Sequence, residues 1–315
     1  MTDRIAIIRN PNAGRQNGPF IAKVAKRLSR AGYPVEILDT QAPGHATEIA
    51  RDLAEGDKAD LIIAAGGDGT IREVATGLKD HKLPVGIIPG GTANVLAREL
   101  GYLPHGRRSS RHVVHALMAK NVIDLYPFSV TLGGESHLGF CWLGAGFDAA
   151  VLSRVSPKLK AVIGRLAFVP ATFRTLFATH KGPDIAWRTA RGKKDAGGEG
   201  TCRWLIAANI QRYAGPFILT RRTAVGEPGL ACLMMTGRGL FARILDQLML
   251  ALGRLDRRAE PLALELGTTL WLGAADVPLQ LDGDYLGEGE AEVTPLATPI
   301  RFRTGHLDRR NRIKP

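Results

Sequence analysis

Residues Ala65-Gly66-Gly67-Asp68-Gly69-Thr70-Ile71-Arg72-Glu73-Val74 decide the fold of this chain. The apolar run at residues 61–64 predicts a buried strand before them, and the helical spacing of Ile71, Val74 and Leu78 predicts a helix after them. The glycines let the backbone turn tightly and keep its N–H groups accessible, which together with the positive end of the helix suits a phosphate. Thr70 is placed to cap the helix, with Glu73 completing a capping box. An ordinary strand-to-helix turn is the alternative interpretation.

A second glycine turn follows one strand later. Residues 89–94 read Pro-Gly-Gly-Thr-Ala-Asn, after the apolar run 85–88 and before the helical run 95–100. Two such turns predict two phosphate-sized pockets at the same carboxyl edge of a parallel sheet. The Asp68 carboxylate at the mouth of the first turn suits a metal ion or a reacting hydroxyl.

The order of predicted elements divides the chain into two domains. Strands alternate with helices from a first strand at 4–9 to about residue 119, which is typical of a parallel sheet covered on both faces. Later, residues 122–130 predict a strand, Gly133-Gly134 a hairpin turn, 139–143 its partner strand, 144–148 a third glycine turn and 156–180 a helix. Strands then dominate, joined by polar turns such as 191–199 and interrupted by an amphipathic helix at 240–255. We therefore expect an α/β domain over residues 1–125 and a mainly antiparallel, β-sandwich-like domain over 126–293, with a late strand near 294–305 that returns to the first domain.

Composition and charge narrow the class of protein. The chain has 315 residues, 45% of them apolar, and its cysteines at 141, 202 and 232 show no metal-binding or redox spacing. We expect a reducing cytoplasm, no disulfides and no signal peptide. The net charge is +12, and residues 154–222 carry 14 Lys or Arg against 3 Asp or Glu. Such a field favours an anionic membrane surface or nucleic acid, with a solvated basic surface as the alternative.

The ordered set of turns resembles a known family. Asn10-Pro11-Asn12-Ala13-Gly14, the Gly66–Thr70 turn with Glu73, and the residue 89–94 turn are similar to the diacylglycerol kinase catalytic domain, whose family includes bacterial lipid kinases and the sphingosine and ceramide kinases. In the second half, Gly146-Phe147-Asp148-Ala149 resembles the substrate-cleft turn, and residues 209–216 occupy the position of an Asn…Gly-Gly segment. Leu281-Asp282-Gly283-Asp284 resembles an Asp-Gly-Glu turn.

This resemblance implies a two-domain, NAD kinase-like lipid kinase that uses ATP and Mg²⁺ and acts on a lipid such as diacylglycerol, a sphingoid base, ceramide or phosphatidylglycerol. It implies a cytoplasmic enzyme associated peripherally with an anionic membrane surface, with no nucleic-acid partner and with a homodimer left open. Asp148 is the implied substrate residue, and Asp68, Asp282 and Asp284 are the implied acidic residues of the transfer centre. The implied nucleotide-binding residues are Asn10, Thr40, Gly66, Gly67, Asp68, Gly69, Thr70, Glu73, Gly91, Thr92 and Asn94.

Two positions depart from the family pattern. Asp284 stands where a glutamate is usual, and Glu227-Pro228-Gly229 stands where bacterial members have the Asp-Asp-Gly turn of a structural magnesium site. Glu227 is the remaining candidate ligand there. We assign Asp284 as the proton acceptor, Asp68 to the metal and triphosphate, and Asp282 to the turn or the metal, with Asp68 as the alternative base.

Two other functions stay open. An NAD kinase has a similar fold and a similar Gly-Gly-Asp-Gly turn, although the Asn-Pro and Asp-Gly-Asp turns follow the lipid-kinase pattern. A non-catalytic binder of nucleotide or lipid is the second alternative. The chain has neither a Walker A lysine motif nor a His-Arg-Asp catalytic loop, so it lacks the characteristic parts of the common NTPases and protein kinases.

Overall fold

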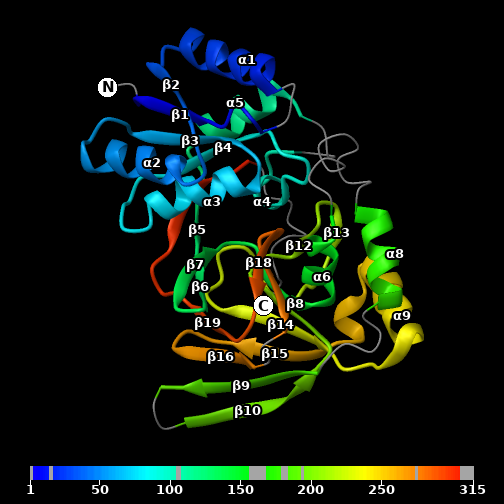
Figure 1. The fold of residues 1–315 in the computed structure, drawn as a ribbon. Coiled ribbons are helices and arrows are strands. Elements are labelled where there is room, and N and C mark those ends of the chain that lie inside the picture. Colours follow the sequence, from blue (N-terminus) through cyan, green and yellow to red (C-terminus); the bar gives the residue numbers. More distant parts are fainter. Residues whose placement is uncertain are drawn as a thin grey trace. The chain divides into compact units, whose positions relative to one another are not determined.

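The structure is a computed structural model that describes residues 3–13, 17–103, 108–155, 168–178, 184–192, 195–273 and 276–305. The chain forms two compact units, Met1–Leu125 with Thr298–Pro315, and Tyr126–Ala297 (Figure 1). Within the described part, no helix combines the length and the apolar character needed to cross a bilayer.

The first unit is built on a six-stranded sheet in which β2, β1, β3, β4 and β20 run parallel and only β5 is antiparallel. The strands β3 and β4 carry no polar side chain and are buried at every position, as expected of a sheet covered on both faces. In sheet order the strands are β2 Val35–Asp39, β1 Ile5–Arg9, β3 Leu61–Gly66, β4 Val85–Pro89, β20 Ile300–Arg303 and β5 Val122–Leu125.

Helices cover both faces of this sheet. Figure 1 shows α1 with α5 on one face and α2 with α3 on the other, and each pair is in contact. Burial on α1 follows Ile21, Val24, Ala25 and Leu28, the face predicted from their spacing. The helices are α1 Asn17–Arg30, α2 His45–Glu55, α3 Asp68–Gly77, α4 Val95–Glu99 and α5 Ser110–Met118.

The second unit contains two six-stranded antiparallel sheets. One has the order β10 Asp195–Cys202, β9 Ile185–Arg191, β16 Thr268–Gly273, β19 Ala291–Pro295, β6 Phe128–Leu132 and β7 Glu135–Gly139. The other has the order β15 Glu260–Leu264, β14 Leu230–Met235, β11 Trp204–Ala208, β8 Trp142–Gly146, β17 Pro278–Leu281 and β18 Asp284–Glu288. The remaining elements are α6 Phe147–Ser153, β12 Arg212–Tyr213, β13 Phe217–Ile218, α8 Phe168–Ala178, α9 Gly239–Ala251 and the 3₁₀ turn η3 Leu255–Arg257.

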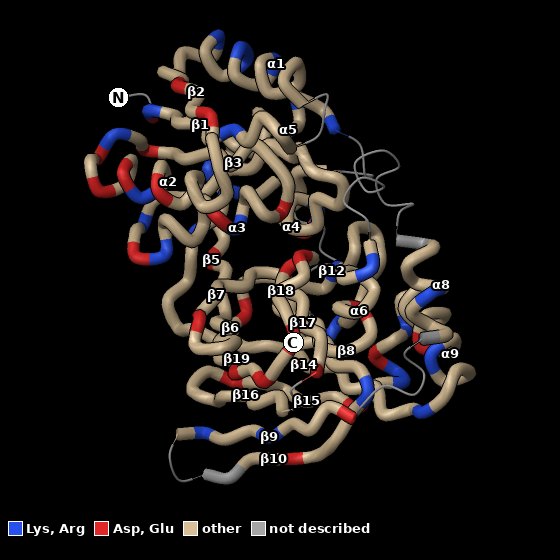
Figure 2. The backbone as a smooth tube through the Cα atoms, viewed as in Figure 1, with Lys and Arg blue, Asp and Glu red and all other residues tan. Residues whose placement is uncertain are grey.

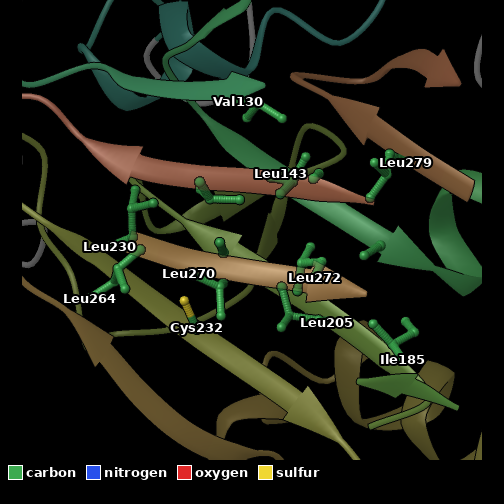
Figure 3. Close-up of a cluster of buried hydrophobic side chains, with 14 of the residues drawn as sticks. Val130, Leu143, Ile185, Leu205, Leu230, Cys232, Leu264, Leu270, Leu272 and Leu279 are labelled. Atoms are coloured by element: carbon green, nitrogen blue, oxygen red, sulfur yellow. The ribbon is translucent and has the colours of Figure 1, made fainter. Parts of the chain in front are cut away.

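One apolar core joins the two sheets of this unit (Figure 3). Val130 and Leu270 come from the first sheet, and Leu143, Leu205 and Cys232 come from the second. Alternating residues of both sheets therefore meet in a common core, which makes the unit a β-sandwich. The predicted fold class, a parallel α/β domain followed by an antiparallel β-sandwich-like domain, is confirmed.

Several predicted elements of the second half were wrong in their bounds. The predicted strand 122–130 is two strands in different sheets, β5 and β6, separated by Tyr126 and Pro127. The partner of β6 is β7, not 139–143, because the Gly133-Gly134 turn pairs Leu132 with Glu135. Within the predicted turn 191–199, β10 already begins at Asp195. Of the predicted helix 156–180, residues 156–167 and 179–180 lie outside the described residues.

Candidate functional site

The two glycine turns lie at the carboxyl ends of neighbouring strands. β3 and β4 pair in parallel with Gly66 opposite Pro89, and the Gly90 N–H donates to the Gly66 carbonyl at 2.7 Å. The predicted juxtaposition of the two turns at one sheet edge is therefore observed within the first unit.

The backbones of the two turns are in direct contact. A Cβ on Gly91 would lie 2.6 Å from the Cα of Gly67, and a Cβ on Gly67 would lie 3.3 Å from the Cα of Gly91. At Gly66 a Cβ would lie 2.6 Å from the Cβ of Thr70. Glycine is required here because the approaching groups are backbone and a packed helix residue.

The predicted capping box was wrong. Helix α3 begins at Asp68 with Gly67 as its N-cap, and no side chain caps it, so Thr70 lies inside the first turn. The Glu73 carboxylate instead accepts the Ala46 N–H of α2 at 3.3 Å, and its carbonyl accepts the Thr47 hydroxyl at 2.9 Å. In this structure Glu73 stabilises the α2–α3 contact rather than the glycine turn.

Asp68 and Asn94 hold the second turn. The Asp68 carboxylate accepts the Leu96 N–H at 3.2 Å, in the first turn of α4. Asn94 adopts a left-handed φ of 48°, accepts the Gly91 N–H and donates to the Gly91 carbonyl, both at 2.7 Å. Gly69 is half-buried in the first turn of α3, and Thr92 is exposed in the second glycine turn. These contacts make the two turns one rigid assembly.

Asn10 and Thr40 lie at the same edge. The Asn10 amide group is 3.4 Å from the Thr70 hydroxyl, and its carbonyl oxygen accepts the Asn12 N–H at 2.9 Å. Thr40 is buried immediately after β2, with its N–H donated to the Arg9 carbonyl at 2.9 Å. The structure thus gathers the predicted nucleotide-binding residues at one sheet edge, except Glu73, which faces α2.

Sequence reasoning missed Asn17. The buried Asn17 side chain donates to the carbonyls of Ala13 and Gly90. The Arg108 guanidinium donates to the Asn17 side-chain oxygen at 2.5 Å and to the Pro89 carbonyl at 3.2 Å. A basic group therefore lies at the second glycine turn. A polar residue at the start of the amphipathic helix α1 was the available signal for Asn17.

In the second unit, Asp148 is the centre of a buried network. One carboxylate oxygen accepts the Ala149 N–H at 2.9 Å and the Trp204 indole N–H at 3.0 Å. The other accepts the Tyr213 hydroxyl and the Gln280 amide, both at 2.9 Å. Burial raises the pKa of the Asp148 carboxyl, and these four donors oppose the rise.

Glycine and glutamine connect this network to the neighbouring strands. A Cβ on Gly144 would collide with the Asp148 carboxylate, so only glycine lets that side chain fold back over β8. The Gln280 side-chain oxygen accepts the Gly283 N–H at 2.9 Å. Gln280 therefore links Asp148 to the turn that carries Asp284. Sequence reasoning missed Gln280, although a glutamine within the apolar strand β17 is a detectable signal.

The Asp282-Gly283 pair forms the two-residue turn between β17 and β18. Both residues have left-handed φ, 53° and 91°, as in the hairpin turns that favour Asp-Gly. The buried Asp282 carboxylate accepts the N–H groups of Phe140, Cys141 and Trp142 at 3.0, 2.7 and 3.1 Å. These bonds hold the turn to the backbone of residues 140–142, and the assignment of Asp282 to the turn or the metal stays a prediction.

Asp284 and Glu227 are both exposed. Asp284 is the first residue of β18 and pairs with Leu281. Glu227 lies in a turn in which its N–H donates to the Ala224 carbonyl at 3.1 Å. Among the described residues there is no group of three or more His, Cys, Asp or Glu that could hold a metal ion. Nothing observed adds a ligand to the predicted metal site at Glu227.

The groups at the glycine turns suit the phosphates of ATP better than they suit a metal ion held by the protein alone. Backbone N–H groups and the start of α3 suit phosphate oxygens. Magnesium is commonly held by one or two carboxylates together with substrate phosphates, and Asp68 offers such a carboxylate at this edge. The donor set therefore fits a metal that arrives with the nucleotide.

Comparison with known proteins identifies the first unit. Residues 4–124 match the model of the diacylglycerol kinase catalytic domain. This matched segment covers most of the N-terminal unit, which is therefore similar to the diacylglycerol kinase catalytic domain. A diacylglycerol kinase of Bacillus subtilis (strain 168) is 36% identical over 169 residues, which are 52% of this chain and 53% of that protein. One from Staphylococcus epidermidis (strain ATCC 12228 / FDA PCI 1200) is 33% identical over 180 residues, 56% of this chain and 54% of that protein. The chain thus spans about half the length of the curated relatives it matches.

Solved structures extend the similarity in fold to nearly the whole chain. A diacylglycerol kinase from Bacillus anthracis str. Sterne superposes with a TM-score of 0.67 over 96% of this chain and 97% of that one, at 17% identity. An NAD kinase from Archaeoglobus fulgidus, in complex with ATP, gives a TM-score of 0.52 over 98% and 95%, at 15% identity. At these identities the likeness concerns the fold alone, and it agrees with the predicted fold class.

Proposed function

We propose that this protein is a kinase that transfers the γ-phosphoryl group of ATP to the hydroxyl of a lipid such as diacylglycerol, a sphingoid base, a ceramide or phosphatidylglycerol. The observation that carries the proposal is the backbone contact between Gly67 and Gly91. It lies at the carboxyl edge of a parallel sheet, within the segment that matches the family model. The enzyme would be cytoplasmic and would meet its substrate at an anionic membrane surface.

The first unit supplies the phosphate-binding part of this reaction. Phosphoryl transfer depends mainly on positioning and charge neutralisation. The N–H groups at the start of α3 bind phosphate oxygens, and Arg108 adds positive charge at the second turn. Magnesium carried with the triphosphate would neutralise further charge, and Asp68 is the residue that would hold it.

The second unit supplies the proton acceptor. A lipid hydroxyl is a weak nucleophile, and a carboxylate within hydrogen-bond reach can accept its proton as the new bond forms. Asp148 is buried among four donors and Asp282 accepts three backbone N–H groups. The exposed Asp284 is the third acidic candidate and the one we assign as base, with Asp68 as the alternative.

The NAD kinase-like fold supports a second candidate function, in which the acceptor hydroxyl belongs to NAD. The two candidates differ in the acceptor and share the nucleotide site. A non-catalytic protein would bind ATP through the same turns without transferring phosphate.

A substrate panel separates these functions. The protein is incubated with Mg²⁺ and γ-labelled ATP, and in parallel with diacylglycerol, sphingosine, ceramide, phosphatidylglycerol or NAD. We expect label in at least one lipid and none in NAD. Label in NAD alone would establish the second candidate, and ATP binding without transfer to any acceptor would contradict both kinase functions.

A further inference from the structure

Helix α9 has its polarity reversed relative to a normal surface helix. Its charged residues, Arg243 and Asp246, point inward, with side chains only 3% and 1% exposed. Three of its large apolar residues, Phe241, Ile244 and Leu248, point outward and are 79%, 47% and 52% exposed, while Leu250 is buried. A surface helix ordinarily buries its apolar stripe and exposes its charges.

Specific partners hold the charged residues inside. The Arg243 guanidinium donates to the Arg203 carbonyl at 2.9 Å and lies 3.9 Å from the Asp246 carboxylate. The other oxygen of Asp246 accepts from the Arg258 guanidinium. Turning the helix over would break these contacts and remove the partners of the Arg203 carbonyl and the Arg258 guanidinium. The outward direction of the apolar stripe is therefore fixed by the fold.

Helix α8 enlarges this apolar surface. It contacts α9, and Figure 1 shows the two helices side by side. Of the ten large hydrophobic side chains exposed in the described residues, six lie on α8, α9 and the residue that ends α9. We call this surface the α8–α9 face, and it comprises Phe173, Phe177, Phe241, Ile244, Leu248 and Leu252.

Arginines border the face. Arg174 is exposed between Phe173 and Phe177, Arg238 is exposed at the N-cap of α9, and Arg254 is exposed just beyond its end. Arg238 is paired with Asp184 at 2.7 Å. Basic positions are visible beside both helices in Figure 2. An apolar face with basic flanks suits acyl chains bordered by anionic headgroups.

We propose that the α8–α9 face docks on an anionic lipid bilayer, with α9 lying in the interface. The inference rests on the proposed lipid-kinase function, because an acceptor hydroxyl in a bilayer requires the enzyme to reach the interface. The face is an apolar patch without outward-pointing charge on α9, and patches of this kind mark membrane or protein contacts. The basic border favours an anionic bilayer over a neutral one.

The test uses the full chain and a quadruple variant, Phe241→Ser, Ile244→Ser, Leu248→Ser and Leu252→Ser. The matched control is Ile37→Ser with Val122→Ser, which removes apolar side chains of 40% and 46% exposure from the first unit. Sedimentation with phosphatidylcholine vesicles containing phosphatidylglycerol measures partitioning. We expect the quadruple variant to partition about a hundredfold less than the parent chain, from the apolar area withdrawn from lipid. The control should partition normally, and binding should weaken at high salt.

Two further measurements keep the result decisive. Phe241→Trp in the otherwise unchanged chain should shift its added emission to shorter wavelength on vesicle addition, and this readout does not depend on the folding of the quadruple variant. Light scattering reports the oligomeric state. Vesicle binding that is unchanged in the quadruple variant would overturn the proposal, as would a dimer that this variant converts to monomer without loss of vesicle binding. An emission of the Phe241→Trp variant that does not shift on vesicle addition would also overturn the proposal.

The experiments distinguish a failure of the docking proposal from a failure of the proposed kinase function. A chain that binds vesicles through this face but phosphorylates no lipid keeps the docking proposal and loses the kinase function. A chain that phosphorylates a lipid dispersed in detergent, yet binds vesicles no better than the quadruple variant, keeps the kinase function and loses the docking proposal.

Discussion

Replacing Asp282 by asparagine tests whether this carboxylate is a support of the β17–β18 turn or a metal ligand. Asn is nearly the same size and tolerates the left-handed φ of 53° that position 282 adopts. The backbone is therefore not expected to change, and the substitution isolates the loss of charge. The side-chain oxygen of the asparagine can still accept the N–H groups of Cys141 and Trp142. Its NH₂ group would face the N–H of Phe140, so that two donors would meet.

The expected loss of folding stability in Asp282→Asn follows from these three hydrogen bonds. One buried backbone N–H loses its acceptor, and the other two exchange a charged acceptor for a neutral one. Leaving a buried donor unsatisfied costs about 1–3 kcal/mol, and hydrogen bonds to charged groups are stronger than neutral ones. We expect Asp282→Asn to lower the free energy of unfolding by about 2–4 kcal/mol. Asp282→Ala should lower it by more, because it removes the acceptor of all three N–H groups.

Urea unfolding followed by circular dichroism measures the loss, with and without Mg²⁺. If Asp282 acts as a support, the difference between parent and variant is the same in both conditions. A stability difference that appears only with Mg²⁺, or a variant as stable as the parent, would refute the assignment. Asp80→Asn, which alters an exposed carboxylate after α3, provides the control for a charge change alone.

The remaining predictions concern the first unit. Gly91→Ala should weaken ATP binding at least about tenfold in calorimetry, because its Cβ would lie 2.6 Å from the Cα of Gly67 and force the turns apart. The control Gly18→Ala has open space around its Cβ and should bind ATP normally. Equal affinity in both variants would contradict the close contact. Asp60→Asn should lower stability at neutral pH by under about 1 kcal/mol, since the pair with Arg4 is exposed. The hydrogen bond from Arg4 lowers the pKa of Asp60 to about 2, so the difference should be fully present above about pH 4 and vanish as the pH falls to about 2. A difference in unfolding midpoint that persists unchanged at the acid end would exclude this pair as its cause.

Local sequence rules identified the parts of the site that depend on short segments. The apolar runs before Gly66 and before Gly90 placed both turns at the ends of parallel strands, because glycine content and strand hydrophobicity act over a few residues. The start of α3 was missed by three residues, since Gly67 and not Thr70 serves as N-cap and Asp68 already belongs to the helix. The role of Glu73 could not be predicted locally, because it depends on packing against α2.

Contacts distant in sequence account for what was missed. The Asp148 network joins Trp204, Tyr213 and Gln280 from separate strands, and no spacing rule brings them together. The same holds for α9, where amphipathicity predicted the helix but not which side faces inward. That choice depends on partners such as Arg203 and Arg258 outside the helix.

The most direct test of the central claim is the effect of Asp284→Asn on lipid phosphorylation and on ATP binding, measured on the same preparation. We assign the nucleotide to the glycine turns of the first unit and the proton acceptor to Asp284 of the second. We therefore expect unchanged affinity for Mg-ATP and a turnover that falls roughly 10²–10⁴-fold, the usual size of general-base catalysis. Near-normal turnover in Asp284→Asn, with Asp68→Asn inactive but still binding Mg-ATP, would contradict the assignment and make Asp68 the base.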